Sequence, residues 1–186
     1  MNQFLDRLFR FLRVHRIMPY INKESVVMDI GCGPHVQLLK EISGQIKEGI
    51  GIDPNVPNNI EGNIKTKTFF LEKNINQESG SVNVVTAMAI LEHLDDPLSI
   101  SKEIYRILKP GGVYLITTPT WIAKPILEFL SFKLHLVDEP SLREHKRYFW
   151  KDELKEILIK SGFRKSNIKL KYFEFGCNLF AVAKKQ

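Results

Sequence analysis

The chain alternates short apolar runs with segments in which apolar residues recur every three or four positions. Runs of four to six residues are typical of buried strands, because both faces of such a strand pack against other elements. They lie at 25–30, 48–52, 68–71, 82–87 and 113–118. The periodic segments predict helices with one apolar face. They lie at 36–43, 97–108 and 151–160.

The residues between these segments mark where elements begin and end. Asp96 and Pro97 predict a helix start, because a carboxylate caps free N–H groups and proline suits the first turn. Gly111 and Gly112 are expected to end that helix. The stretch 56–62 is rich in Asn and Pro and is predicted to be a loop.

The C-terminal residues predict a hairpin, with strands at 168–175 and 179–183 joined by a turn at 176–178. Strands that alternate with helices indicate a parallel sheet with helices on both faces. We therefore predict an α/β fold with a mostly parallel seven-stranded sheet and a C-terminal antiparallel hairpin. No repeat or low-complexity linker divides the chain, so a single domain over 1–186 is expected.

Two segments depart from this alternation. Residues 4–16 predict an amphipathic helix with arginines among its apolar residues, and we expect 1–20 to form a cap. Peripheral contact with an anionic membrane through 1–18 is the alternative. Residues 121–137 are apolar and aromatic, with a helix expected at 126–132, and 119–148 are interpreted as an insertion or lid over a site.

Composition and charge narrow the class of protein. Hydrophobic residues make up 44% and charged residues 26%, as in ordinary soluble globular proteins. The net charge of +6 is interpreted as a solvated surface, and no nucleic acid partner is expected because no RNA-binding motif or basic block accompanies it. The two cysteines, Cys32 and Cys177, are too few for a disulfide framework and lack metal-ligand spacing. We expect no metal and a cytoplasmic location.

Polar features follow three successive predicted strands, and ligands bind beyond the carboxyl ends of strands in open parallel sheets. Asp29 precedes the loop Gly31-Cys32-Gly33-Pro34, whose glycines let the backbone approach a ligand. Asp53 ends the second strand, where a carboxylate can accept both hydroxyls of a ribose. Asn74-Ile75 follows the third, where an amide and an apolar side chain can flank a base. Together these features predict a nucleoside-binding site.

A dinucleotide site is the main alternative to this interpretation. Its Gly-x-Gly-x-x-Gly fingerprint needs a third glycine where this chain has Val36. Pro34 and His35 occupy the intervening positions. A nicotinamide-dependent oxidoreductase is therefore disfavoured.

Several segments resemble the motifs of class I S-adenosylmethionine-dependent methyltransferases. The sequence VMDIGCGP at 27–34 resembles the first motif of that family, and GID at 51–53 resembles the second. The segments that follow the fourth strand, precede the fifth and lead into the last helix are also similar, at 89–97, 104–112 and 145–163. The resemblance covers roughly 25–165 in the family's order and is nearest to the small-molecule, ubiquinone-type branch. It implies a Rossmann-like sandwich.

This resemblance implies S-adenosylmethionine as the cofactor and assigns its parts to the strand ends. The first loop would hold the methionine part, Asp53 the ribose and the Asn74-Ile75 pair the adenine, with Ala87 beneath the sulfonium. The expected cofactor-binding residues are Asp29, Gly31, Cys32, Gly33, Asp53, Pro54, Asn74, Ile75 and Ala87. The chain departs from the family pattern at three positions: His35 for a common glycine, Asn74 for a common aspartate, and Trp150 for a capping Ser or Thr.

A methyltransferase needs a general base only where its acceptor carries a proton of high pKa. His145, before the last helix, is the candidate base, and a surface histidine in a charged run is the alternative. His93 is expected to line the pocket or to be structural. The apolar and aromatic residues at 121–137 favour a small, apolar or aromatic acceptor. A non-catalytic or partner-dependent S-adenosylmethionine-binding domain is the alternative function, and the oligomeric state stays open.

Overall fold

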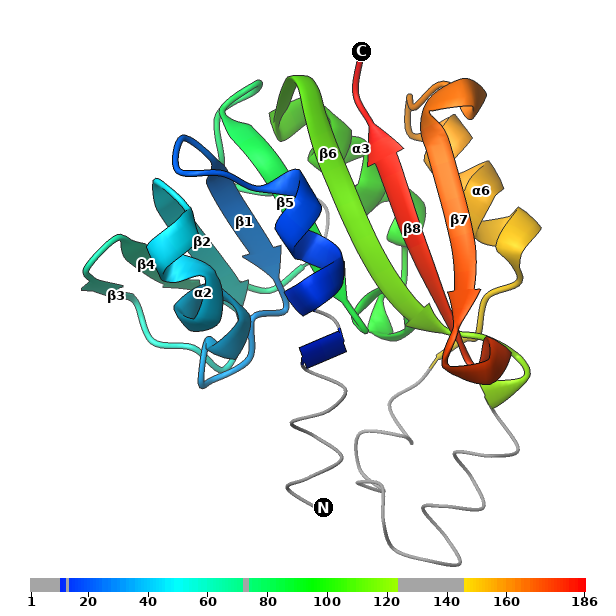
Figure 1. Cartoon of the computed structure of the whole chain (residues 1–186), viewed down its shortest axis with the longest axis horizontal. Coiled ribbons are helices and arrows are strands. Elements are labelled where there is room, and N and C mark those ends of the chain that lie inside the picture. Colours follow the sequence, from blue (N-terminus) through cyan, green and yellow to red (C-terminus); the bar gives the residue numbers. More distant parts are fainter. Residues whose placement is uncertain (1–10, 13, 72–73, 124–145) are drawn as a thin grey trace, which may run out of the picture.

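In the described residues, eight strands form one sheet, and the direction in which successive strands are added reverses between β1 and β5 (Figure 1). The computed structural model describes residues 11–12, 14–71, 74–123 and 146–186. Across the sheet the order is β3-β4-β2-β1-β5-β6-β8-β7. The strands are β1 Val26–Ile30, β2 Glu48–Asp53, β3 Asn59–Glu61, β4 Ile64–Thr68, β5 Val82–Met88, β6 Leu108–Pro119, β7 Ile168–Phe173 and β8 Asn178–Lys184.

The middle of the sheet is parallel, and antiparallel pairs lie toward its two edges. β1 pairs in parallel with β2 and β5, β2 with β4, and β5 with β6. β8 is antiparallel to both β6 and β7, and β3 is antiparallel to β4. The predicted fold class, mostly parallel with an antiparallel C-terminal hairpin, is confirmed.

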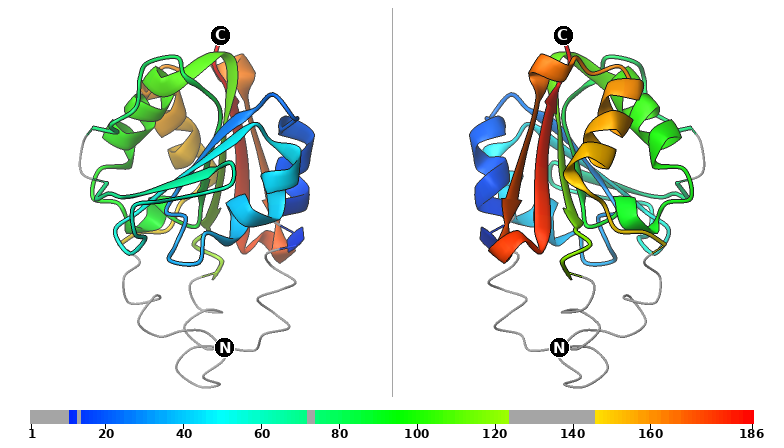
Figure 2. Two further views of the ribbon diagram at one scale, coloured as in Figure 1. Left: turned by 90° about the vertical axis from the view of Figure 1, so that its left-hand side faces the viewer. Right: turned by 90° about the vertical axis from the view of Figure 1, so that its right-hand side faces the viewer.

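Helices cover both faces of the sheet (Figure 2). α2 (Gln37–Ile42) and the helical residues at 14–17 lie on one face, and α3 (Pro97–Ile107) and α6 (Lys151–Lys160) lie on the other. Short 3-10 turns are found at η1 Met18–Tyr20, η2 Ser43–Gln45, η3 Leu91–His93, η4 Lys165–Asn167 and η5 Glu174–Gly176. The layers are therefore helix, sheet and helix.

Both faces of the central strands are apolar because each face packs on helices. In β1, Val27 packs with the α2 cluster, which includes Leu39, while Met28 packs with the α3 and α6 cluster, which includes Ile104 and Leu154. All five side chains are at most 1% exposed. Because successive side chains point to opposite faces, both of which are covered, the strand is apolar at every position except Asp29.

The predicted start of α3 is confirmed, but the helix ends earlier than expected. The Asp96 carboxylate accepts a hydrogen bond from the Ser99 N–H at 3.0 Å, and Pro97 occupies the first turn. α3 ends at Ile107, and β6 begins at the next residue rather than after Gly112. Pro110 explains this difference, because the residue before a proline disfavours the helical conformation.

The third predicted strand and the predicted loop before it are wrong in position. The strand is β4 at Ile64–Thr68 rather than 68–71, and three residues of the predicted loop form β3, which makes eight strands instead of seven. β4 alternates apolar or hydroxyl side chains with exposed lysines, so it has no apolar run to recognise. The residues of β3 are all exposed and owe their conformation to pairing with β4.

Two predicted segments lie largely outside the described residues. Of the predicted cap at 1–20, the structure describes 11–12 and 14–20, and of the predicted insertion at 119–148 it describes 119–123 and 146–148. The helix expected at 126–132 lies outside them, so the cap and the lid remain predictions. No helix in the described parts of the chain is long and apolar enough to cross a membrane.

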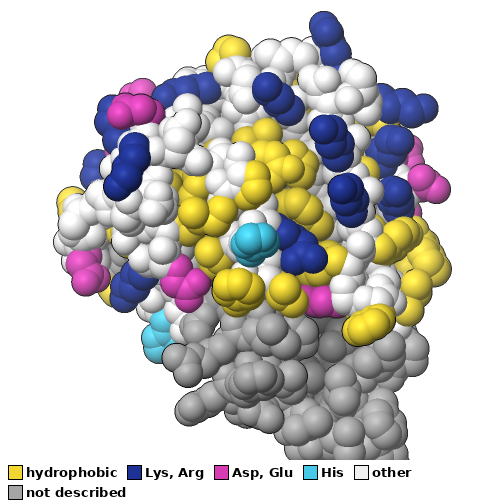
Figure 3. All heavy atoms as spheres, in the orientation of Figure 1, with side chains coloured by type: hydrophobic (Ala, Val, Ile, Leu, Met, Phe, Trp, Pro, Cys, Tyr) yellow, Lys and Arg dark blue, Asp and Glu magenta, His cyan; other side chains and the backbone are white. Residues whose placement is uncertain are grey.

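Basic residues outnumber acidic ones in the C-terminal part of the chain. Residues 164–186 contain six basic residues and one acidic residue. The basic residues are Arg164, Lys165, Lys169, Lys171, Lys184 and Lys185. Because Ile168 and Leu170 are buried, their exposed neighbours in β7 point to the face opposite α6. Figure 3 shows basic side chains over this side of the molecule, beside apolar surface.

Candidate functional site

The loop after β1 turns sharply at two glycines with positive φ, Gly31 at 73° and Gly33 at 65°. The Gly31 N–H donates to the Ile52 carbonyl at 2.9 Å, which brings the loop back over the end of β2. A Cβ on Gly31 would lie 2.6 Å from Cδ1 of Ile90, whereas a Cβ on Gly33 would meet nothing within 4 Å. Gly31 is therefore needed for packing, and the space beside Gly33 leaves the backbone open to a ligand.

The Asp53 carboxylate joins the two loops at the ends of β1 and β2. One of its oxygens accepts the Gly33 N–H at 3.0 Å, and the other accepts the Asn55 N–H at 2.8 Å. The residue is 8% exposed, and Pro54 beside it is exposed. A carboxylate has about four acceptor positions, so both oxygens retain capacity for ligand hydroxyls.

Asp29 lies deeper, at 3% exposure, beside Thr86 of β5. The Thr86 hydroxyl donates to its carboxylate at 2.6 Å. Burial raises the pKa of Asp29 to about 7, the Thr86 hydrogen bond opposes the rise, and the charge of Asp53 adds to it. The carboxyl group is thus held close to a change of protonation near neutral pH.

Cys32 is a packing residue within the first loop. Its Sγ lies against β2, where a Cβ on Gly51 would be 2.9 Å from the sulfur. Burial raises the pKa of the Cys32 thiol to about 12, and Asp29 and Asp53 add to the rise. The thiol is therefore protonated at neutral pH and acts as a small apolar group.

Val36, at the third glycine position of a dinucleotide fingerprint, has an unusual backbone conformation. Its φ of 52° and ψ of 36° are left-handed, although the residue is β-branched. Such strain costs on the order of 1–3 kcal/mol and is common near functional sites. The 6% exposed Val36 side chain packs in the α2 cluster, and this burial offsets part of the cost.

A pocket of about 140 Å³ lies beside β1 and against the carboxyl-terminal residues of β2 and β4. It is lined by Met28, Ile52, Asn58, Lys67, Thr68, Phe69, Ile75 and Asn76. A cavity of roughly this size can take a six-membered aromatic ring. Ile75 is 3% exposed and shares the lining with Asn76, whereas Asn74 is not among the lining residues. The sequence pattern identified the segment but not which amide faces the pocket.

Ala87 is fully buried in β5, paired with Ile30 on one side and Ile116 on the other. Its side chain packs in the α3 and α6 cluster. The chain then turns at Ala89, whose φ is 55°, and presents Ile90 to Gly31. The segment after β5 therefore borders the first loop, with Ala87 at its base.

The residues just before α6 are bonded to the segment after β5. The Lys146 N–H donates to the Glu92 carbonyl at 3.0 Å, and its ammonium group is 2.6 Å from Asp95. Glu92 is fully buried, with its carboxylate accepting from Thr118 at 3.1 Å. His93 is half-buried nearby, while His145, the candidate base, lies outside the described residues.

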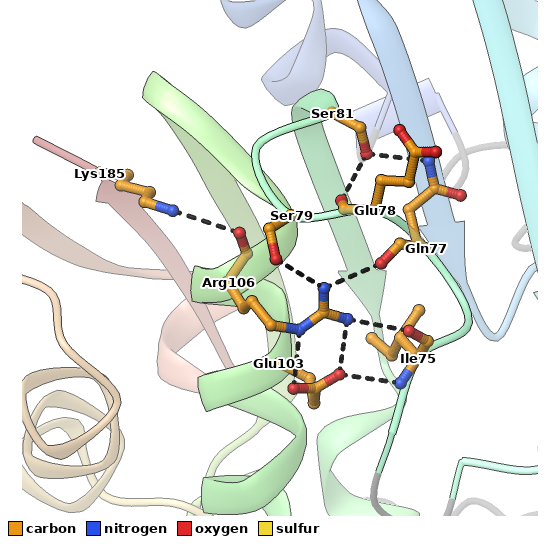
Figure 4. Close-up of polar contacts among 8 residues, drawn as sticks. All are labelled: Ile75, Gln77, Glu78, Ser79, Ser81, Glu103, Arg106 and Lys185. Carbon is orange, nitrogen blue, oxygen red and sulfur yellow. Dashed lines mark hydrogen bonds and ion pairs between the residues drawn. The ribbon is translucent and has the colours of Figure 1, made fainter.

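Glu103 and Arg106 of α3 contact the segment that contains Ile75, and the sequence did not predict this contact (Figure 4). They form an ion pair at 2.8 Å and bond to the backbone of Ile75. An oppositely charged pair three positions apart on a helix was the available signal. That spacing predicts a contact within the helix, but nothing in it indicates a contact with a distant loop.

A family model described as a methyltransferase domain matches residues 1–167. The ubiquinone biosynthesis O-methyltransferase of Psychrobacter arcticus is 26% identical over 156 residues, which are 76% of this chain. The match spans 60% of that relative's length.

Two solved structures share the fold. One is a SAM-dependent methyltransferase from Archaeoglobus fulgidus, with TM-score 0.71 and 21% identity, covering 96% of this chain and 94% of that one. The other is from a complex between the Haloferax volcanii Trm112 methyltransferase activator and a methyltransferase, with TM-score 0.69, 15% identity and coverage of 94% and 89%. At these identities the likeness is one of fold.

Proposed function

Because this chain belongs to the methyltransferase-domain family, we propose that it binds S-adenosylmethionine beyond β1, β2 and β4 and transfers the methyl group to a small acceptor. The hydrogen bond from Gly33 to Asp53 carries this proposal. It holds a loop that is open to a ligand against a carboxylate with free acceptor positions, next to a pocket of ring size. A ligand with a sugar between a base and a charged chain matches this arrangement, with the sugar at the carboxylate, the base in the pocket and the charged chain at the loop.

The residues present fit the three parts of this cofactor. Asp29 would face the ammonium end through the first loop, in which Gly31, Cys32 and Gly33 supply backbone. Asp53, with Pro54 beside it, would accept the ribose hydroxyls. Asn74 and Ile75 would contact the adenine, and we add Asn76 because it lines the pocket. Ala87 would form the base of the site beneath the sulfonium.

When bound, S-adenosylmethionine supplies a methyl group already activated by its sulfonium. The residues of this chain then have to orient the acceptor and exclude water. We propose His145 as the group that removes a proton if the acceptor is a phenol or alcohol. An acceptor whose nucleophilic atom carries no such proton would need no base.

The acceptor is proposed to be small and apolar or aromatic. The rings of Trp121 and Tyr148 lie 5.6 Å apart between centroids, at the two described ends of the predicted insertion. Trp121 is 39% exposed and Ile122 46%, so apolar surface is available there. The printed name of the Psychrobacter relative, an O-methyltransferase of ubiquinone biosynthesis, is consistent with an aromatic hydroxyl as the acceptor.

Calorimetric titration with S-adenosylmethionine and separately with NADH tests the cofactor. We expect binding of the first at about micromolar Kd, and none of the second. Asp53→Ala removes the ribose acceptor and should weaken binding at least tenfold, roughly the loss of one charge-assisted hydrogen bond. Asp152→Ala, an exposed change on α6, is the control.

Absence of S-adenosylmethionine binding to the folded wild-type chain would overturn the proposal for this chain alone. Adding candidate partner proteins would then separate a partner-dependent domain from a fold that has lost the cofactor.

A further inference from the structure

Arg106 uses all five of its N–H donors in one cluster (Figure 4). Nε and Nη2 bond to the two carboxylate oxygens of Glu103 at 3.0 and 2.8 Å. Nη2 also bonds to the Ile75 carbonyl at 3.0 Å, and Nη1 bonds to the Gln77 carbonyl at 2.9 Å and to the Ser79 hydroxyl at 3.0 Å. The side chain therefore ties α3 to the segment at 75–79.

Glu103 completes the contact from the other side. Its Oε2 accepts the Ile75 N–H at 3.1 Å, so both backbone polar groups of Ile75 are bonded to this ion pair. The Glu103 side chain is 18% exposed and that of Arg106 36%. The guanidinium holds the pKa of the Glu103 carboxyl below its usual range, mainly through their hydrogen bonds. The pair is thus charged when it holds the loop.

The same segment is fastened separately at its far end. The N–H groups of Gly80 and Ser81 donate to the carbonyls of Arg106 and Ile107 at 3.0 and 2.9 Å. These bonds are between backbones and do not need the side chains of Glu103 or Arg106. Loss of the ion pair would therefore release residues 75–79, at the pocket, and leave 80–81 attached to α3.

We propose that the Glu103–Arg106 pair positions the nucleoside end of the cofactor pocket, acting through Ile75. Ile75 and Asn76 line that pocket, and the backbone N–H and carbonyl of Ile75 are hydrogen-bonded to the pair. This inference rests on the proposed function, because it takes the pocket as the place of the base. Glu103 and Arg106 are positioning residues, since neither of them lines the pocket.

The Ile75 N–H is bonded to Glu103, and the Ile75 carbonyl accepts from Arg106 and also from the Gln77 N–H at 2.7 Å. Ile75 therefore offers a base only its apolar side chain. Polar contacts with the base then fall to other lining residues, of which Asn58 and Asn76 carry amides. The base is held by shape at Ile75 and by amide hydrogen bonds beside it.

Glu103→Gln tests the proposal, because it replaces one acceptor oxygen with an NH₂ group that faces the donors of Arg106 and Ile75. Arg106→Lys keeps the charge but loses the planar group that bonds to Glu103, Ile75, Gln77 and Ser79 at once. Glu156→Gln is the matched control, since it removes one carboxylate of an exposed ion pair on α6. The ligands are S-adenosylhomocysteine and adenosine, titrated by calorimetry and ligand-observed NMR.

We expect both site variants to bind S-adenosylhomocysteine and adenosine about tenfold more weakly, with thermal midpoints close to that of the control. Hydrogen exchange should become faster at the Ile75 amide and stay unchanged at Ser81. Wild-type affinities in folded variants would overturn the positioning role. So would a loss for S-adenosylhomocysteine without one for adenosine.

If Glu103→Gln is unstable, amide hydrogen exchange at Ile75 and Ser81 in the milder Arg106→Lys protein tests the positioning role. Equal acceleration of exchange at both amides would contradict the proposal. Failure of the wild-type chain to bind either ligand would instead count against the proposed function.

Discussion

At the scale of the residue, Asp29 shows how burial sets the chemistry of an acidic group. Its carboxyl is 3% exposed and receives one hydroxyl hydrogen bond, which is too little to replace the water that a carboxylate prefers. Its pKa of about 7 therefore reflects the cost of keeping a charge there. A nearby cation, such as the ammonium group of a bound amino acid, would favour the charged form and lower this pKa.

This pKa makes stability depend on pH in a definite direction. Between the ordinary value of 3.8 and about 7, the folded chain binds the Asp29 proton more tightly than the unfolded chain does. The contribution of this group to the free energy of unfolding thus falls as pH rises through that window, by ~1.4 kcal/mol per pKa unit and a few kcal/mol at most.

Asp29→Asn should remove that contribution, because an amide accepts the Thr86 hydrogen bond without ionising. Urea denaturation at pH 5 and pH 8 measures it. We expect the variant to gain stability relative to wild type at pH 8, and less so at pH 5. An equal difference at both values would contradict the raised pKa, and Asp152→Asn on the surface of α6 provides the reference.

At the scale of the element, Lys185 closes the C-terminal end of α3 from a residue far along the chain. Its ammonium group donates to the carbonyls of Tyr105 at 2.6 Å and Leu108 at 2.8 Å, and lies 3.3 Å from that of Arg106. The last carbonyls of a helix have no partner within it and carry partial negative charge. The cation therefore satisfies the end of α3 and links it to the residues after β8.

Lys185→Met keeps the aliphatic stem but removes the three donors, so the carbonyls must turn to water. The expected loss is about 1.5–3 kcal/mol of unfolding free energy, the usual size for hydrogen bonds to a charged group. Lys184→Met, at the exposed neighbouring position, should change stability by less than about 0.5 kcal/mol. Chemical denaturation of both variants measures the difference, and equal effects would rule out a specific role for Lys185.

Whether a strand could be predicted from the sequence depended on how much of it is buried. The strands at 26–30 and 82–88 were predictable because burial on both faces leaves a short run in which most residues are apolar. The prediction missed β4 because its outward positions carry lysines. It placed the strand at 68–71 instead, on account of apolar residues such as Phe70, which is 67% exposed.

The candidate site divides in the same way. The loop glycines and Asp53 come together because each directly follows a strand, and strand ends meet in space. The contact between Arg106 and Ile75 joins residues that no local pattern relates, so only the structure could reveal it.

At the scale of the whole molecule, stability should decrease from the middle of the sheet outward. Val27, Val85 and Leu115, in the three central strands, are all fully buried, whereas Ile60 in the edge strand β3 is 70% exposed. Amides of β1, β5 and β6 can exchange only through large opening events, while β3 needs only the loss of one short antiparallel pairing.

Hydrogen exchange with mass spectrometry should therefore find β3 exchanged within the earliest time points and the three central strands protected by several orders of magnitude more. The free energy of opening for the central amides should approach the global value, typically about 5–15 kcal/mol. Comparable protection in peptides from β3 and β5 would contradict this order.

The place of β8 between β6 and β7 has a consequence for how the chain is made. On the ribosome, β7 emerges before β8, yet in the described sheet β8 is the strand that β7 pairs with. A nascent chain that has released only residues up to 177 thus holds β7 without its neighbour and β6 with an open edge. Such edges invite pairing with other chains. The interval before 178–184 leave the exit tunnel is when this protein would most depend on chaperones.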